Sequence, residues 1–477
     1  MGQRPRELTP LESALHSFGA ELRYWRTLRE LSQAGLGQLT HDSSALISKI
    51  EKAERFPSLA LARRLDAALA TEGVLERLWP QVEQERTNRT LCPSLPVDHS
   101  EPIPADLGLL WPATAAATVE VVGKLWRADM ERRSVLLSAT WVASAFAEPV
   151  REWLLNRTEE LLQDRPGRAV NQSDIDALRS MCEAFTDADL RLGGGYARST
   201  LMHYVSEVVL PLLHGSYRDA IGRELMAATS RLCDLCAFMS FDSGMHGLAQ
   251  RYFIQALRLA QASRNRMLGA HILADMSNQA HHLGNTTMAL ELATAGYRTA
   301  LNCGSLSTAA KCAALQSRAH ALRGEQRACA QTFTIAEKTL DRAVPTGGRT
   351  WVMIFTDDQL IAQRLYVAGD LGRYKDVQRI APEALAFSSE SVRRQVLYTT
   401  ALAASYLPAE GNPHSDVDRA CELLGQVVTS FGSLRSARSM ERFNAVRRAL
   451  APYAQRPSVQ EFEDRYRTTT MAGFTQA

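Results

Sequence analysis

The stretch SQAGLGQLTHDSSALISKIEKAERFPS, from Ser32 to Ser58, predicts two short helices joined by a tight turn. Gln33 opens the first helix, and the second is entered through Ser43. A polar loop follows and stops at Pro57. This order of elements is the layout of a helix-turn-helix unit.

The first helix carries an inward face and a polar beginning. We expect Leu36 and Leu39 to point inward, and Gly37 is small where the two helices must approach closely. At the start of the helix, the side-chain amide of Gln33 lies beside free backbone N–H groups, a combination that can meet a DNA phosphate.

The second helix has one apolar side, made of Leu46, Ile47 and Ile50. Its remaining side chains are short, polar or basic and are expected to face outward: Ser44, Ala45, Ser48 and Lys49. A helix that reads bases from the major groove needs such side chains near its beginning.

Three linked runs resemble the Xre, or phage-repressor-like, family of helix-turn-helix domains. Gln33–Gly37 matches the family's Gln-x-x-Leu-Ala run, Ile47–Glu51 its Ile-Ser-x-Ile-Glu run, and Pro57–Leu59 its Pro-Ser-Leu run. The resemblance extends without a gap from about Phe18 to about Leu69.

The resemblance implies roles for single residues. Gln33 and Ser43 would touch phosphates, Arg26 would pair with Glu51, and the base edges would be faced by Ser44, Ala45 and Lys49. His41 departs from the family, which usually has Gly or Asn in the turn, so the turn is expected to differ locally if a positive φ is needed there.

The charge of this region is low for a DNA-binding domain. Residues 1–64 contain ten Lys or Arg and seven Asp or Glu, a difference of +3, and the whole chain has a formal net charge of +2. A weak electrostatic footprint favours a dimer that reads two half-sites of an inverted repeat. It also keeps open a domain that has the fold but has lost DNA binding.

The remaining composition bounds the class of protein. The chain of 477 residues has no apolar signal segment and no run long enough to span a membrane, so a cytoplasmic protein is expected. It has no phosphate loop, no G-x-S-x-G and no H-E-x-x-H motif, so we predict neither an enzyme nor a cofactor. The Gly193–Gly195 run is interpreted as a helix break.

The eight cysteines are expected to be reduced thiols within helices. Cys233 and Cys236 form the only C-x-x-C pair, without the further ligands that a zinc site needs. We interpret them as small buried residues and predict no metal site.

The pattern predicts an all-α chain in five parts. These are a five-helix domain at 1–86, a proline-rich linker at 87–112, a helical connector at 113–173, an α-solenoid at 174–466 and a tail at 467–477. Trp126, Trp141 and Trp153 in the connector are expected in its core.

A repeat of 40 residues runs through the second half of the chain. Gly244, Gly284 and Gly324 each stand between two helical segments. Small or aromatic residues recur at fixed offsets from these glycines: Ala237, Ser277 and Ser317; Ala249, Ala289 and Cys329; Phe253, Ala293 and Phe333; Ala256, Gly296 and Ala336. The offsets resemble the tetratricopeptide repeat, although the period is longer than its 34 residues. The Val344–Arg349 segment is expected to be a looser connection.

In tetratricopeptide repeats the first helix of each pair lines a concave groove. Carrying those groove positions onto this chain selects Arg231, Asp234, Phe238, Phe241, His271, Asn278, His281, Lys311 and Arg318. Asn278 could hold a peptide backbone, while Lys311 and Arg318 would favour an anionic group. A solvated polar helix face is the alternative interpretation.

Together, the Xre-like head, the Trp-rich middle and the repeats resemble a group of actinobacterial regulators. That resemblance implies a DNA-binding transcriptional regulator, a homodimer whose solenoid senses a peptide, a small molecule or a small protein. The alternative is a scaffold or adaptor with a vestigial helix-turn-helix head.

Overall fold

The structure is a computed structural model, and it describes residues 14–71, 73–91, 104–131, 139–155, 159, 161, 168–344, 350–409, 412–432 and 434–475. The chain divides into two compact units, Met1–Pro102 and Ile103–Ala477. Over the described ranges the chain is built from helices, with no strand and one isolated bridge between Ala169 and Ser216. The predicted all-α fold is therefore confirmed. None of the described helices is both long and apolar enough to cross a membrane.

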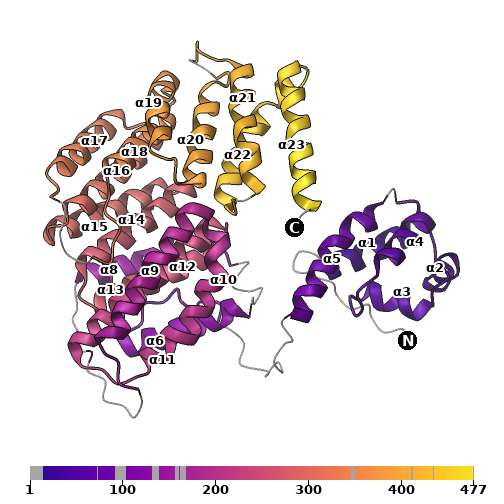
Figure 1. The fold of residues 1–477 in the computed structure, drawn as a ribbon, viewed down its shortest axis with the longest axis horizontal. Helices are drawn as coiled ribbons and strands as arrows, with labels where there is room; N and C mark the ends of the chain where they lie inside the picture. The colour runs from indigo at the N-terminus through magenta and orange to yellow at the C-terminus, as the bar shows by residue number, and fades with distance from the viewer. Residues whose placement is uncertain are drawn as a thin grey trace. The chain divides into compact units, whose positions relative to one another are not determined.

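The first unit contains five helices, as predicted: α1 (Ala14–Leu28), α2 (Gln33–Thr40), α3 (Ser44–Glu51), α4 (Leu59–Leu69) and α5 (Val74–Leu91) (Figure 1). The side-chain oxygens of Ser32, Ser43 and Ser58 accept hydrogen bonds from the first turns of α2, α3 and α4, which fixes where each helix begins. Without these caps, the first N–H groups of each short helix would lack a partner.

The core of the first unit is apolar and shared by its helices. Phe18 of α1, Leu36 of α2 and Ile47 and Ile50 of α3 are fully buried. Leu39 is the exception to the prediction, since 56% of it is exposed although it lies three residues beyond buried Leu36 on the same helix. The expectation that it points inward is wrong.

The second unit is a succession of helices, in two stretches. The first comprises α6 (Ala115–Met130), α8 (Ala147–Leu155), α9 (Gln172–Leu192), α10 (Gly194–Tyr204), α11 (Leu210–Leu213) and α12 (Asp219–Asp242). The second comprises α13 (His246–Ala262), α14 (Arg266–His282), α15 (Thr286–Asn302), α16 (Leu306–Leu322), α17 (Gln326–Asp341), α18 (Asp357–Asp370), α19 (Tyr374–Ala386), α20 (Val392–Ser405), α21 (Val417–Val427), α22 (Ala437–Ala449) and α23 (Pro457–Thr475). The predicted tail at 467–477 begins inside α23, and residues 345–349 of the predicted loose connection lie outside the described residues.

Consecutive helices from α12 to α17 are joined by turns of one design. Each turn contains one residue with positive φ: Gly244, Arg264, Gly284, Gly304 and Gly324. The left-handed conformation ends one helix and reverses the chain, and glycine adopts it without a steric penalty. The three glycines of the repeat therefore mark alternate turns, while Gly304 and Arg264 mark the turns between them.

The predicted repeat positions are buried where neighbouring helices meet. Ser277 donates a hydrogen bond from its hydroxyl to the carbonyl of Ala289 at 2.8 Å, and Ser317 donates in the same way to Cys329 at 2.9 Å. These contacts lie one repeat apart and join α14 to α15 and α16 to α17. Small side chains at these offsets thus allow helix backbones to come within hydrogen-bond distance of a side chain.

Helix α13 is buried on all sides, although one face is polar. Gln255 donates to the carbonyls of Gly108 and Leu110 at 2.8 and 3.0 Å, Arg251 to that of Ala105 at 2.7 Å and Arg258 to that of Pro112 at 2.9 Å. Residues 104–112, which the sequence analysis placed in the linker, therefore pack on α13 and satisfy its polar face.

Helix α8 covers the repeats farther along the chain. Trp153 is fully buried against Gly269, where a Cβ would come within 2.0 Å of its ring. Its indole N–H donates to the Thr299 hydroxyl at 3.2 Å. Trp126 is also fully buried, so these two tryptophans are core residues, as expected.

The last helices of the second unit return to its first ones, and the contact is made by charged groups. Asp242, at the end of α12, lies within 3.2 Å of Arg393 of α20 and 3.1 Å of Arg438 of α22, and accepts from the Ser436 hydroxyl at 2.9 Å. Arg393 also pairs with Asp189 of α9 at 2.7 Å. We call Asp189, Asp242, Arg393 and Arg438 the clasp.

The Gly193–Gly195 run lies beside the clasp and breaks the helix, as predicted. Gly193 has a φ of +85° and ends α9, and the backbone N–H of Gly194 donates to Asp242 at 3.1 Å. A Cβ on Gly194 would meet the backbone of Met239 at 2.8 Å. Three glycines are accommodated here because the backbones pass too closely for side chains.

Candidate functional site

The turn between α2 and α3 is held by its backbone. His41 has a φ of +58°, and the N–H of Asp42 donates to the carbonyl of Gly37 at 2.8 Å. A Cβ on Gly37 would come within 2.5 Å of the Asp42 carbonyl oxygen, which explains the small residue at this position. The departure at His41 therefore falls on a residue that does need positive φ, as the sequence analysis anticipated.

The outward face of α3 is free to meet a ligand. Ser44, Ala45 and Lys49 are exposed, and Ser48 is half-buried. Ser43 is exposed as well, and its side-chain oxygen accepts from the N–H of Leu46 at 3.2 Å. The residues expected to face base edges thus lie on one short helix whose first turn is fixed by its cap.

Glu51, at the end of α3, connects the helices of this unit. It is buried and pairs with Arg26, whose Nη2 donates to its carboxylate at 3.0 Å, as the resemblance implied. The side-chain amide of Gln33 donates to the same carboxylate at 2.7 Å. The amide of Gln33 is therefore occupied within the domain, which leaves its carbonyl and the start of α2 for an external partner.

The basic side chains of the first unit differ in whether a carboxylate holds them. Arg26, Arg63 and Arg64 bind the carboxylates of Glu51, Glu76 and Asp42. In contrast, Lys49 and Arg55 are exposed and Lys52 is half-buried, and none of the three makes an ion pair with a carboxylate of the described residues. Arg23 and Arg29 also make no ion pair among the described residues, but their guanidinium groups donate to the carbonyls of Glu51 and Leu69. Lys49, Lys52 and Arg55 thus place positive charge that a nucleic acid could neutralise on α3 and the loop after it.

A cavity of about 220 Å³ lies on the inner face of the second unit. Its lining comes from alternate helices, the first of each successive pair: α9, α12, α14, α16, α18, α20 and α22. The segment before α18 also contributes. Most residues selected as groove positions line this cavity: Arg231, Phe238, His271, Asn278, Lys311 and Arg318.

Three other groove positions are not among the residues that line this cavity. His281 is 3.4 Å from Asp370, which also binds Arg318 at 3.1 Å. Burial lowers the pKa of His281 to about 4, so the ring is neutral at pH 7. Phe241 packs its ring against His282, and Asp234 pairs with Arg231 at 2.5 Å.

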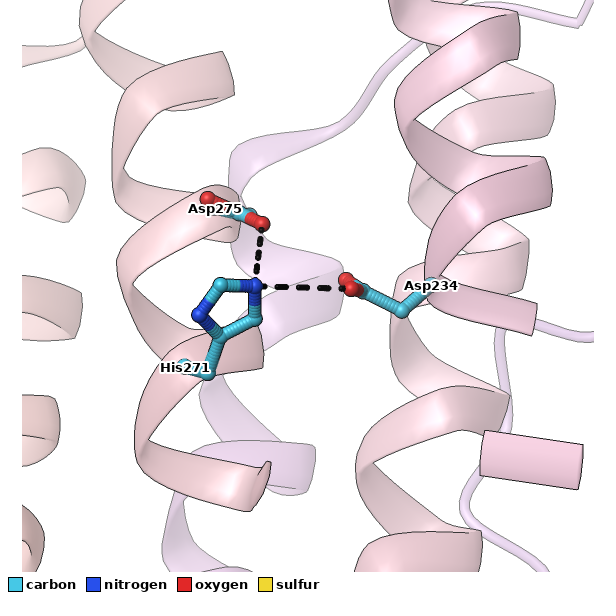
Figure 2. A group of neighbouring side chains, drawn as sticks. All are labelled: Asp234, His271 and Asp275. Carbon is cyan, nitrogen blue, oxygen red and sulfur yellow. Dashed lines mark ion pairs between the residues drawn. The ribbon is translucent and has the colours of Figure 1, made fainter. Parts of the chain in front are cut away.

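The side chains of Asp234, His271 and Asp275 come together (Figure 2), and two of them, His271 and Asp275, line the cavity. The His271 ring lies 3.3 Å from Asp275 and 3.8 Å from Asp234. Burial, together with the positive charge of nearby Lys311, lowers the pKa of His271 to about 3. Burial and repulsion from Asp275 raise the pKa of Asp234 to about 7.

These three side chains have the ligand atoms of a metal site, but their charge is already balanced. Asp234 is paired with Arg231, and Lys311 donates to Asp275 at 2.6 Å. A divalent ion would lie beside both cations and would have to displace them. The arrangement is therefore better described as a buried ion-pair cluster.

Several residues of the cavity were not selected from the sequence: Gln363, Tyr366, Arg393, Arg394, Tyr398, Arg438 and Arg442. They belong to α18, α20 and α22, where the repeat offsets weaken, and sequence periodicity did not extend to them. Their distance along the chain from α12 means that only the return of the last helices brings them to the cavity. The adjacent pair Arg393 and Arg394 at the start of α20 was the available signal.

Residues 17–79 match a family model described as a helix-turn-helix domain. No curated protein and no solved structure matches the chain. The matched residues are those that form α1 to α4 and the beginning of α5, with the exposed face of α3 among them. The chain therefore carries a helix-turn-helix domain, which indicates a DNA-binding regulator.

Proposed function

We propose that the protein is a sequence-specific transcriptional regulator of the Xre type. The observation that carries this proposal is the exposed face of α3, where Ser44, Ala45 and Lys49 follow a capped first turn within the helix-turn-helix domain. Short polar, methyl and basic side chains at the start of such a helix can contact base edges in the major groove. Gln33 and Ser43, at the beginnings of α2 and α3, would contact phosphates through backbone N–H groups.

The second unit is proposed as the sensing and dimerisation part, with tetratricopeptide-like repeats. Supporting this, the 40-residue spacing of its positive-φ glycines coincides with helix pairs whose first members line one cavity. A peptide, small molecule or small protein bound there would change operator affinity if it altered how two chains pair. Sedimentation of the full chain with and without operator DNA tests the proposed homodimer.

The first experiment is selection of genomic fragments by the purified full chain, followed by sequencing. We expect enrichment of an inverted repeat, with half-sites that a dimer would read. Gel shifts on the enriched site then test the face of α3: Lys49→Glu should weaken binding at least tenfold and reduce its salt dependence. The matched control is Lys338→Glu, the same charge change at an exposed position of α17.

The alternative is a scaffold or adaptor with a vestigial head. It is favoured by the modest charge of the first unit and by the occupation of Arg26, Arg63 and Arg64 by carboxylates. Under this alternative no genomic fragment would be enriched, and Lys49→Glu and Lys338→Glu would behave alike. That pair of results would refute the regulator.

A further inference from the structure

Among the described residues, one cation that lines the inner cavity has no carboxylate partner. The other cations of its wall are paired: Arg231 with Asp234, Lys311 with Asp275, Arg318 with Asp370, Arg393 with Asp189, Arg394 with Asp358 and Arg438 with Asp242. Arg442 of α22 makes no ion pair within the described part of the chain, and its guanidinium lies 5.2 Å from the ring centroid of Tyr366. Arg442 is half-buried, and a partly desolvated positive charge that makes no ion pair among the described residues favours a bound anion.

The charged groups around Arg442 further favour a bound anion. Burial lowers the pKa of Arg442, and the nearby cations Arg318 and Arg438 lower it further. Three guanidinium groups thus approach one end of the cavity with only Asp370 and Asp242 to neutralise them. One negative group bound there would balance the charge, and the planar guanidinium can hold a carboxylate or a phosphate by two hydrogen bonds.

The cavity also offers polar groups that lack partners. The side-chain carbonyl oxygen of Gln363 is buried without a hydrogen-bond partner in the described structure. Asn278 lines the cavity, is half-buried and likewise makes no hydrogen bond there. Buried polar atoms are nearly always paired, so an unpaired acceptor in a cavity wall indicates a ligand or a water with a donor group.

The remaining wall is apolar and aromatic. Leu235 and Phe238 of α12, Leu315 of α16 and Leu397 of α20 face the cavity, and the rings of Tyr366 and Tyr398 lie edge to face at 5.9 Å. Small-molecule sites combine such walls with a few polar groups that fix orientation. The volume of about 220 Å³ lies below the roughly 300–1,000 Å³ typical of sites for drug-sized ligands, so among the candidate effectors it suits a small molecule best.

We propose that the inner cavity binds a small organic anion whose single carboxylate or phosphate group pairs with Arg442, while an apolar or aromatic body packs against Phe238 and Leu397. A donor on the ligand would satisfy Gln363. The proposed binding site is argued from the second unit alone. Its role as an effector site rests on the proposed function.

The test is calorimetric titration of the full chain with defined probes. Phenylacetate, octanoate and phenyl phosphate represent carboxylates and a phosphate with an apolar body, and phenylacetamide is the neutral counterpart of phenylacetate. We expect at least one of the three anions to bind at one site per chain. The phosphate and carboxylate arms distinguish the two sources of the anionic group. We expect phenylacetamide and inorganic phosphate to bind at least tenfold more weakly than the best anion.

Variants locate the site. Arg442→Gln should weaken binding of the best anion at least tenfold. Arg448 is an exposed arginine on the same helix, and Arg448→Gln should leave the affinity unchanged. Arg442→Gln loses the contact with the Tyr366 ring but also the repulsion from Arg318 and Arg438, so without ligand it should melt close to the unmodified chain. A melting temperature that is unchanged means that weaker binding cannot be ascribed to unfolding.

Four results would overturn the proposal: no anion binding below 10 mM, equal binding of phenylacetamide, equal binding of inorganic phosphate, or equal binding by Arg442→Gln. Binding of a neutral hexapeptide in preference to every anion would do the same. Operator gel shifts on the same preparations separate the two proposals. A chain that binds DNA but no probe contradicts the anion site alone, and one that binds a probe but no DNA contradicts the regulator alone.

Discussion

Replacing Asp242 with asparagine removes the central carboxylate of the clasp. Asp242 is fully buried and accepts from Arg393, Arg438, Ser436 and the backbone of Gly194. Asn keeps the shape and one acceptor oxygen but not the charge. Arg393 retains Asp189, whereas Arg438 loses its only carboxylate among the described residues. The variant therefore leaves one guanidinium uncompensated between α12 and α22.

The magnitude follows from the burial of the pair. Removing one partner of a buried ion pair costs about 3–5 kcal/mol, and the surviving Arg393 contact places Asp242→Asn at the lower end, about 3 kcal/mol. An unfolding entropy of about 2.1 cal/mol/K per residue amounts to roughly 0.8 kcal/mol/K for the 103–477 unit. We expect the melting temperature of this unit to fall by about 4 °C in differential scanning calorimetry.

The pH dependence has a definite sign. Burial alone would raise the pKa of Asp242, but Arg393 and Arg438 outweigh it and hold the pKa below its ordinary value. The stabilisation from a carboxylate with a depressed pKa is present above about pH 4 and is lost as the pH falls through the folded-state value. The difference between Asp242→Asn and the unmodified chain should thus be constant from pH 5 to 8 and shrink below pH 4.

The matched control is Asp187→Asn, which removes a carboxylate from an exposed pair with Arg191 on α9. Exposed helix pairs contribute about 0.3–0.5 kcal/mol, so this variant should melt within 1 °C of the unmodified chain. If Asp242→Asn melts together with Asp187→Asn, the clasp does not stabilise the return of the last helices, and the reasoning is refuted.

Three further predictions concern single residues. Glu51→Gln should destabilise the first unit by about 2 kcal/mol in urea denaturation, because buried Glu51 accepts charge-assisted hydrogen bonds from Arg26; an unchanged midpoint would contradict this role. His41→Gly should stabilise the same unit by about 1 kcal/mol, since glycine adopts the positive φ of the turn without strain, and a loss of stability would show that the His41 side chain contributes more than the strain costs. Asp234→Asn should cost less stability at pH 8 than at pH 5. Burial and Asp275 raise the pKa of Asp234 to about 7, so ionisation of Asp234 weakens the folded state between about pH 4 and 7, a loss that the asparagine variant avoids; parallel pH profiles of the two melting temperatures would contradict it.

Much of the fold could be predicted because its signals are local. Ser43 and Ser58 mark helix starts within a few residues, and Gly244, Gly284 and Gly324 mark turns that need a positive φ. Such features depend on the backbone of neighbouring residues, and periodicity carries them directly. The misplacement of Leu39 has a physical reason too. On a helix of eight residues, one inward face accommodates few side chains, and an apolar residue can remain exposed.

The packing of residues 104–112 on α13 could not be predicted from the sequence. A polar helix face has the same sequence pattern whether its hydrogen bonds are made to water or to protein. Gln255 and Arg258 are buried and bind carbonyls of residues 108–112. A hydrogen bond between residues more than a hundred positions apart leaves no periodic signal in one sequence.

One wall of the inner cavity could be predicted from the sequence, and the opposite wall could not. Arg231, His271 and Lys311 stand at 40-residue spacing on α12, α14 and α16, and this periodicity predicted one wall of the cavity from the sequence. The opposite wall, with Arg442 and Arg393, comes from α20 and α22 and reaches the cavity only through the clasp with Asp242. Periodicity records which side chains share a helix face. Which distant face they meet depends on small rotations between helix pairs that accumulate along the chain, and on the buried charges that fix where those rotations end.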